Sequence, residues 1–129
     1  MLGTFRDLIA WQKAMQLVST IYRETENLPK HELYGLTGQI RRAAVSVASN
    51  IAEGQARHSR KEFPYFLSTA RGSIAEVQTP ILIAANLGYL CPANAEEIYT
   101  QTADVCRLVN KLYSSLQLTT KNEERRTER

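Results

Sequence analysis

Basic side chains gather in the middle of the sequence, in a pattern that could bind phosphate groups. Between Thr37 and Arg71 there are six basic side chains and only two acidic ones, although the whole chain carries a net charge of only +3. Lys and Arg bind nucleic acid by displacing counterions from its phosphates. The candidate nucleic-acid-binding residues are Arg41, Arg42, Arg57, Arg60 and Lys61. A basic loop that is merely solvated is the alternative interpretation.

A second set of polar residues recurs within the same, otherwise apolar, part of the chain. The set comprises Gln39, Ser46, Asn50 and Glu53, followed by Arg71, Ser73 and Glu76. The first four are separated by 7, 4 and 3 residues, so they share one side of a helix. Solvent exposure explains this stripe as well as a hydrogen-bonded network does. We adopt the structural network, within the chain or between subunits, as the prediction.

The remaining reactive residue types do not form a catalytic or metal-binding set. His31 and His58 are the only histidines, and neither has a cysteine or carboxylate at metal-ligand spacing. The segment Gly35–Gly38 is shorter than a phosphate-binding loop and contains no lysine. A serine or cysteine nucleophile needs a histidine base beside it, and both histidines lie near predicted helix ends. We therefore expect no enzymatic activity, no metal and no cofactor.

Hydrophobic periodicity predicts four helices that would position these residues, over about 7–28, 35–56, 59–87 and 92–118. The first should begin at Asp7, a good N-cap, and end before Pro29, which lacks the amide hydrogen. Alternating steps of three and four residues define its expected inward face. That face comprises Leu8, Trp11, Met15, Val18, Tyr22 and Thr25.

The other three helices carry clear boundary signals. Ser59 and Glu62 form a capping box at the start of the third helix, Pro80 should kink it and Gly88 should end it. Pro92 suits the first position of the fourth. The expected inward face of the second helix comprises Leu36, Ile40, Ala43, Val47, Asn50 or Ile51, and Gly54. That of the third comprises Phe63, Leu67, Ala70, Ile74, Val77, Ile81 and Ala84, and that of the fourth comprises Ala95, Ile98, Thr102, Val105, Val109, Leu112 and Leu116. Small residues in the second helix favour close approach of a neighbour.

These elements predict an all-α fold, an antiparallel up-down-up-down four-helix bundle, formed by residues 1–118. Residues 119–129 contain no apolar side chain, and we expect them to be a disordered tail. No apolar run reaches the ~20 residues that span a bilayer, and the N-terminus lacks the features of a signal peptide. We expect a cytoplasmic protein in which Cys91 and Cys106 are free thiols.

A resemblance to a known family covers nearly all of the chain except the tail. It is carried by GLTGQIRRAAVSVASNIAEG at 35–54, SRKEF at 59–63 and ARGSIAE at 70–76, with further matches at 5–14 and 87–90. These segments closely resemble the bacterial four-helix bundle proteins, also called 23S rRNA intervening-sequence proteins. The family is similar in fold to the accessory proteins of diversity-generating retroelements.

The resemblance implies a cytosolic bundle that assembles into a homopentamer. Some family members are encoded within insertions in the large ribosomal RNA gene, and the retroelement accessory proteins form basic pentamers that engage nucleic acid and a reverse transcriptase. Two hypotheses follow for this chain. It is either a homo-oligomer that binds RNA or DNA through its basic residues, or a protein-interaction scaffold whose ring presents a surface to an unknown partner.

Overall fold

The computed structural model describes residues 3–127, and this part of the chain contains four α-helices and no β-strand. The helices are α1 (Ile9–Thr25), α2 (Gly38–Ala56), α3 (Glu62–Asn86) and α4 (Pro92–Thr127). Three short helical turns precede α1 and α2: η1 (Phe5–Asp7), η2 (Lys30–Glu32) and η3 (Leu33–Thr37). The all-α prediction with four helices is therefore confirmed.

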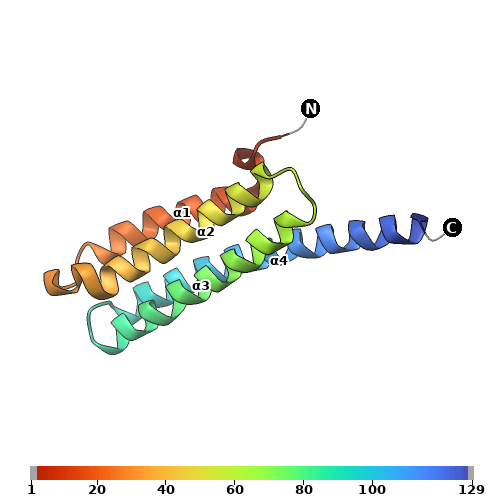
Figure 1. Cartoon of the computed structure of the whole chain (residues 1–129). Helices are drawn as coiled ribbons and strands as arrows, with labels where there is room; N and C mark the ends of the chain where they lie inside the picture. The colour runs from red at the N-terminus through yellow and green to blue at the C-terminus, as the bar shows by residue number, and fades with distance from the viewer. Residues whose placement is uncertain (1–2, 128–129) are drawn as a thin grey trace.

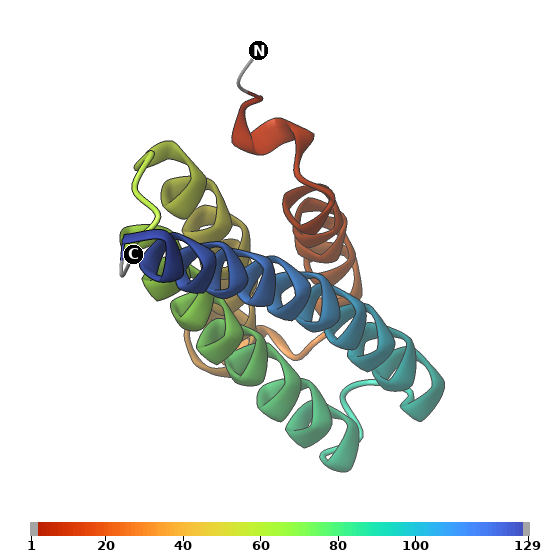
Figure 2. The ribbon, with the colours of Figure 1, turned by 90° about the vertical axis from the view of Figure 1, so that its right-hand side faces the viewer.

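The four helices enclose a common interior. Each packs against the next along the chain, and α1 also packs against α4. In Figure 1 the 57–61 connection, the N-terminal turn and the C-terminal part of α4 lie at one end of the molecule, and the 87–91 connection lies at the other. The last turns of α4 extend beyond the other helices in Figure 1 and point toward the viewer in Figure 2.

One apolar face of each helix forms the core. The largest fully buried side chains are Leu17 and Ile21; Ile40, Val47 and Ile51; Leu67, Ile74, Val77 and Ile81; and Ile98, Val105 and Val109. Each such burial contributes about 1.5–3 kcal/mol. The inward faces predicted for α3 and α4 are confirmed, with Leu112 and Leu116 partly buried. In α2 the prediction holds from Ile40 to Gly54, with Ile51 rather than Asn50 in the core.

The inward face predicted for α1 is wrong by one position around the helix. The buried residues are Ala10, Ala14, Leu17, Thr20, Ile21 and Thr25, so Thr25 is the one predicted position that is buried; the predicted Leu8, Trp11 and Val18 are partly buried against the core. Met15 and Tyr22 remain 44% and 43% exposed. The sequence carries two adjacent apolar stripes at the same spacing, and the core takes the one that contains alanines. Short side chains at Ala10 and Ala14 let α1 approach its neighbours closely.

The capping signals act slightly differently from the prediction. Asp7 is not the N-cap of α1: it is the third residue of η1, whose N-cap is Thr4, and its carboxylate accepts a 3.1 Å hydrogen bond from the backbone N–H of Thr4. Leu8 is the N-cap of α1 and offers no side-chain hydrogen bond. At α3, Ser59 does accept the predicted hydrogen bond from the N–H of Glu62, at 3.3 Å, although regular helix begins only at Glu62.

The C-terminal end of α3 is closed by glycine, as predicted. Gly88 has φ +78°, which glycine adopts without steric cost. Its N–H donates to the Ala85 carbonyl at 3.0 Å, and the N–H of Tyr89 donates to the Ala84 carbonyl at 2.9 Å. This is the Schellman arrangement, which satisfies carbonyls at the helix end. Helix α3 continues through Pro80 as far as Asn86, and the kink expected at Pro80 stays a prediction.

The end of α4 differs from the disordered tail that we expected. The helix continues to Thr127, and residues 128–129 lie outside the described part of the chain. No glycine or proline follows Leu118 to stop it, and Lys, Glu and Arg are good helix formers. The tail's charged side chains at 121–126 are exposed, as their polarity predicts.

Helices α2 and α3 come unusually close together at Gly54. A methyl group at this position would lie 2.8 Å from Phe63 Cδ1 and 2.9 Å from Phe66 Cβ, well inside van der Waals contact. Gly72 of α3 differs, because no heavy atom outside its own helix backbone and chain neighbours lies within 4 Å of such a methyl group. The close packing of α2 and α3 therefore requires glycine at position 54, whereas no neighbouring atom requires it at position 72.

We expect Gly54→Ala to lower the free energy of unfolding by about 1–3 kcal/mol, because the methyl group forces α2 and α3 apart. Gly72→Ala, the matched control, should raise it by about 0.5–1 kcal/mol, because alanine loses less backbone entropy in a helix. Urea unfolding followed by circular dichroism measures both. Equal stability of the two variants would contradict the close approach of α2 and α3.

Candidate nucleic-acid interface and polar network

The five predicted nucleic-acid-binding residues lie in two separate places. Arg41 and Arg42 lie near the start of α2, whereas Arg57, Arg60 and Lys61 follow its end. At about 1.5 Å of rise per residue, Arg41 and Arg57 are separated by roughly 24 Å along the helix. The structure therefore does not bring the five residues into one compact patch.

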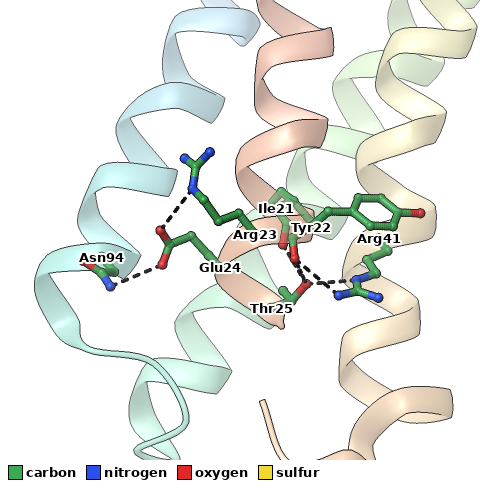
Figure 3. Close-up of polar contacts among 7 residues, drawn as sticks. All are labelled: Ile21, Tyr22, Arg23, Glu24, Thr25, Arg41 and Asn94. Atoms are coloured by element: carbon green, nitrogen blue, oxygen red, sulfur yellow. Dashed lines mark hydrogen bonds and ion pairs between the residues drawn. The ribbon is translucent and has the colours of Figure 1, made fainter. Parts of the chain in front are cut away.

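Arg41 holds α1 and α2 together (Figure 3). Its Nε–H donates to Thr25 Oγ1 at 2.9 Å, and Nη2 donates to the Tyr22 carbonyl at 3.3 Å. The guanidinium also lies over the Tyr22 ring, 4.6 Å from its centroid, and 3.7 Å from the Glu26 carboxylate. Only 21% of the Arg41 side chain is exposed, and its guanidinium joins α1 to α2.

Arg57 is also engaged, but on the surface. It donates to Glu53 Oε1 at 2.8 Å, and its guanidinium lies 5.3 Å from the centroid of the Phe66 ring. The hydrogen bond and charge of Glu53 raise the pKa of Arg57, so the guanidinium stays protonated. Arg57 keeps its charge at the end of α2 even though Glu53 offsets it locally.

The end of α4 contributes to this region. Arg60 forms an ion pair with Glu123, which ties the 57–61 connection to the α4 extension. Lys61 is exposed and has no hydrogen bond or ion pair within the described residues. Arg126 lies three residues after Glu123, on the same side of α4, and is exposed. We call Arg57, Arg60, Lys61 and Arg126 the basic end. Arg126 was not among the predicted residues, because residues 119–129 were expected to be disordered.

Three of the seven residues predicted for the polar network do form one. The hydroxyl groups of Ser46 and Ser73 share a 2.9 Å hydrogen bond between α2 and α3. Asn50 Nδ2 donates to the carbonyl and the hydroxyl of Ser46, at 2.8 and 3.0 Å. Ser73 is only 6% exposed, so this contact joins the two helices next to the apolar core.

The other four residues have separate surroundings. Arg71 does not reach Asn50 or Glu53, because it lies two residues before Ser73 and so about 200° away around α3. It donates instead to Asn110 of α4, at 3.1 Å, and lies over the Tyr113 ring of α4. Glu53 pairs with Arg57, while Gln39 and Glu76 are exposed. The single network of the prediction is therefore divided into an α2–α3 contact, an α3–α4 contact and surface groups.

Two of the apolar grooves on the surface border α2. The α1–α2 groove, of ≈ 270 Å³, is lined by Trp11, Met15, Val18, Val45, Ala48, Ser49 and Ala52. The α2–α3 groove, of ≈ 330 Å³, is lined by Leu36, Gln39, Ala75, Glu76, Thr79, Pro80 and Ile83. The first groove contains three residues of the predicted α1 stripe: Trp11 and Val18 are partly buried against the core, and Met15 is exposed.

Further features bear on chemistry and location. Cys91 is exposed and Cys106 partly buried, and both are free thiols, as predicted. Among residues 3–127, no three His, Cys, Asp or Glu side chains are grouped so that they could hold a metal ion. Within that same range, no helix is both long enough and apolar enough to cross a bilayer.

Comparison with known proteins defines the class of this helical chain. The sequence profile described as 23S rRNA-intervening sequence protein matches residues 6–111, which include the whole of α1–α3, both grooves and three of the four residues of the basic end. The chain belongs to this family, as its sequence segments predicted.

A solved structure shows the same fold. It is the crystal structure of a protein of unknown function from the S23 ribosomal protein family of Bacteroides thetaiotaomicron, with a TM-score of 0.76 and 19% sequence identity. The similarity covers 82% of this chain and 96% of that one, so it extends over nearly the whole of the other protein. No curated protein matches this chain.

The Ser46–Ser73 contact generates a stability prediction. Ser73→Ala should lower the free energy of unfolding by about 1–2 kcal/mol, because it leaves the Ser46 hydroxyl without its partner on α3. In the double variant Ser46→Ala with Ser73→Ala, the second substitution should cost less than it does alone. A double-mutant cycle measured by urea unfolding tests this coupling, and strictly additive effects would show that the hydroxyl contact contributes nothing.

Proposed function

We propose that this protein is a non-enzymatic assembly protein: an antiparallel up-down-up-down bundle that forms a cyclic homo-oligomer and presents the ring surface to a partner. The α1–α2 groove carries the proposal, because it is lined by an apolar stripe of α1 that the chain buries only in part. We place the protein in the cytoplasm, where the exposed thiol of Cys91 would stay reduced.

Short connections support the antiparallel topology. The segments 57–61 and 87–91 have five residues each and can span at most about 18 Å when fully extended. Helix α2 has 19 residues, and α3 has 25, so each is at least roughly 28 Å long. A chain that leaves one end of α2 or α3 cannot return to the other end within five residues. Neighbouring helices that pack together must then run in opposite directions.

The α1–α2 groove has the character of a surface that is covered in an assembly. Met15 and Val45 are large apolar side chains that remain 44% and 41% exposed, and Trp11 and Val18 are partly buried beside them. Contiguous apolar surface of this kind marks interaction sites in soluble proteins. Ala52 on the groove wall is short, so a helix of a second copy could approach α2 closely.

A ring with an odd number of subunits needs two different surfaces that fit each other, because its interfaces are head-to-tail. The α2–α3 groove supplies the second surface, with Leu36, Pro80 and the 41% exposed side chain of Ile83 on its walls. In this arrangement the α1–α2 groove of one copy packs against the α2–α3 groove of the next copy. Five copies is the number that the family resemblance implies.

We expect the protein at micromolar concentration to have a mass about five times 14.6 kDa by light scattering coupled to size-exclusion chromatography. Val45→Glu should lower the mass, because it places a charge in the α1–α2 groove. Leu118→Glu is the matched control, since Leu118 is 62% exposed on α4 outside both grooves, and it should leave the mass unchanged. A parent protein of 14.6 kDa would refute the assembly.

Nucleic-acid binding is the second candidate function, and the basic end favours it. The Lys61 ammonium has no partner within residues 3–127, and two further exposed basic residues lie at the same end of the bundle: Arg60, which is paired with Glu123, and Arg126. One copy offers too few phosphate contacts for strong binding at physiological salt. A ring would repeat the basic end, and a long polyanion that reaches several copies would gain affinity through effective concentration.

The variant Arg57→Glu, Arg60→Glu and Lys61→Glu should weaken binding of RNA and duplex DNA at low salt by at least about tenfold. The control Lys13→Glu, Arg107→Glu and Lys111→Glu changes the charge equally at exposed positions elsewhere and should have a smaller effect. Fluorescence anisotropy across salt concentrations, with the mass checked by light scattering, measures both. Equal binding by the two variants would exclude the basic end and leave the protein-binding scaffold.

A further inference from the structure

An exposed aromatic ring lies beside the cations of the basic end. Lys61 has helical backbone angles, φ −78° and ψ −38°, and Tyr65 follows it by four residues, so the two side chains share one face of α3. Tyr65 is 67% exposed. Neither of the grooves that the proposed assembly covers is lined by Tyr65. The ring is therefore a surface group that neither the core nor the proposed subunit contact uses.

Contacts within the basic end hold the Tyr65 ring in place. It packs edge-to-face against Phe66, with the ring centroids 5.2 Å apart and the planes at 82°. Phe66 in turn packs against α2 at Gly54, and the Arg57 guanidinium lies 5.3 Å from its ring centroid. Arg57, Phe66 and Tyr65 therefore form a row that begins with a cation and ends with an exposed ring. An edge-to-face contact covers at most one face of the Tyr65 ring, so another planar group can stack on the other face.

The positive charge of the basic end is largely offset. Two of its four cations are already paired, with the carboxylates of Glu53 and Glu123. Glu62 adds a third exposed carboxylate, next to Lys61 in the sequence. Such a surface makes few uncompensated phosphate contacts, and binding by charge alone would be lost as the salt concentration rises. Binding of nucleic acid at this end therefore needs a contribution besides charge.

The Tyr65 ring supplies a contribution that only unpaired bases can use. In a duplex, neighbouring base pairs cover the faces of each base, whereas the bases of a single strand can turn outward and stack on an aromatic side chain. Proteins that bind single strands combine cations that follow the phosphates with aromatic rings that stack on the bases. The exposed ring beside Lys61 has this composition.

We propose that the basic end binds single-stranded nucleic acid, with the Tyr65 ring stacked on one base while Lys61 and Arg57 contact neighbouring phosphates. The proposal rests on the nucleic-acid binding proposed above as the second function, and it adds the class of nucleic acid and the residue that selects it. Every base has a flat face, so stacking on Tyr65 gives no preference for sequence.

Fluorescence anisotropy of the full chain at low salt tests the class of nucleic acid. The probes are oligo-dT and oligo-U of about 20 nucleotides and a duplex DNA of the same length. We expect the better of the two single strands to bind at least about fivefold more tightly than the duplex, and the comparison of oligo-dT with oligo-U shows whether DNA or RNA is preferred. A site that recognises charge alone gives the opposite order, because the duplex carries more phosphates. Duplex binding as tight as single-strand binding would overturn the proposal.

Substitutions of tyrosine test the stacking contact. Tyr65→Ser should weaken binding of the single strand at least about fivefold and leave duplex binding unchanged, because only the single strand stacks on the ring. Tyr65→Phe keeps the ring and should bind like the parent. Tyr34→Ser is the matched control, since Tyr34 is 91% exposed and lies before the start of α2, whereas the basic end follows its other end. This control should leave all binding unchanged.

The charge-reversal variant Arg57→Glu, Arg60→Glu and Lys61→Glu separates this proposal from nucleic-acid binding in general. If that variant loses single-strand binding while Tyr65→Ser keeps it, the basic end binds phosphates without stacking, and only the role of Tyr65 is refuted. Equal weakening of single-strand and duplex binding by Tyr65→Ser refutes that role too. If the parent protein binds none of the three probes, nucleic-acid binding itself is refuted. Circular dichroism and light scattering check that each variant keeps the fold and mass of the parent.

Discussion

Close contact between α2 and α3 is the constraint on which the other features of this structure depend. Gly54 leaves no room for even a methyl group beside Phe63 and Phe66, so the two helices meet at the end where residues 57–61 connect them. Farther along the same interface, the hydroxyl groups of Ser46 and Ser73 are 2.9 Å apart. This contact fixes which sides of α2 remain outside: one toward the α1–α2 groove and one toward the α2–α3 groove.

The sequence was sufficient to predict the four helices, their order and three of the four inward faces. The signals were local ones: Gly88 at the end of α3, Pro92 at the start of α4, and a single apolar stripe in α3 and in α4. Helix α1 could not be predicted in the same way, because the stripes containing Ala14 and Met15 have the same period. Only the packing of α1 against α2 and α4 decides between them, and the second stripe became the apolar surface on which the assembly proposal rests.

The candidate site was predicted less well, because a charged residue does not reveal its partner in the sequence. Arg41 and Arg57 are the same residue type in the same helix, yet Arg41 is held by Thr25 and Tyr22 of α1 while Arg57 pairs with Glu53 on the surface. The ion pair of Arg60 with Glu123 joins positions 63 residues apart and depended on a helical α4 end that was not foreseen. Likewise the buried Thr37 hydroxyl, which lacks a hydrogen-bond partner within residues 3–127, follows from burial and backbone geometry rather than from any motif.

Trp11 reports directly on whether a second copy covers the α1–α2 groove, because it is the chain's only tryptophan and lines that groove. Acrylamide quenching of its fluorescence should be measured as the protein is diluted from micromolar to low nanomolar concentration. If a second copy covers the groove, Trp11 is protected at high concentration, and its quenching increases and its emission shifts to longer wavelength as the assembly dissociates. Quenching in the Val45→Glu variant should be high at every concentration. Strong quenching of the parent protein at micromolar concentration, equal to that of the variant, would show that no second copy covers the α1–α2 groove.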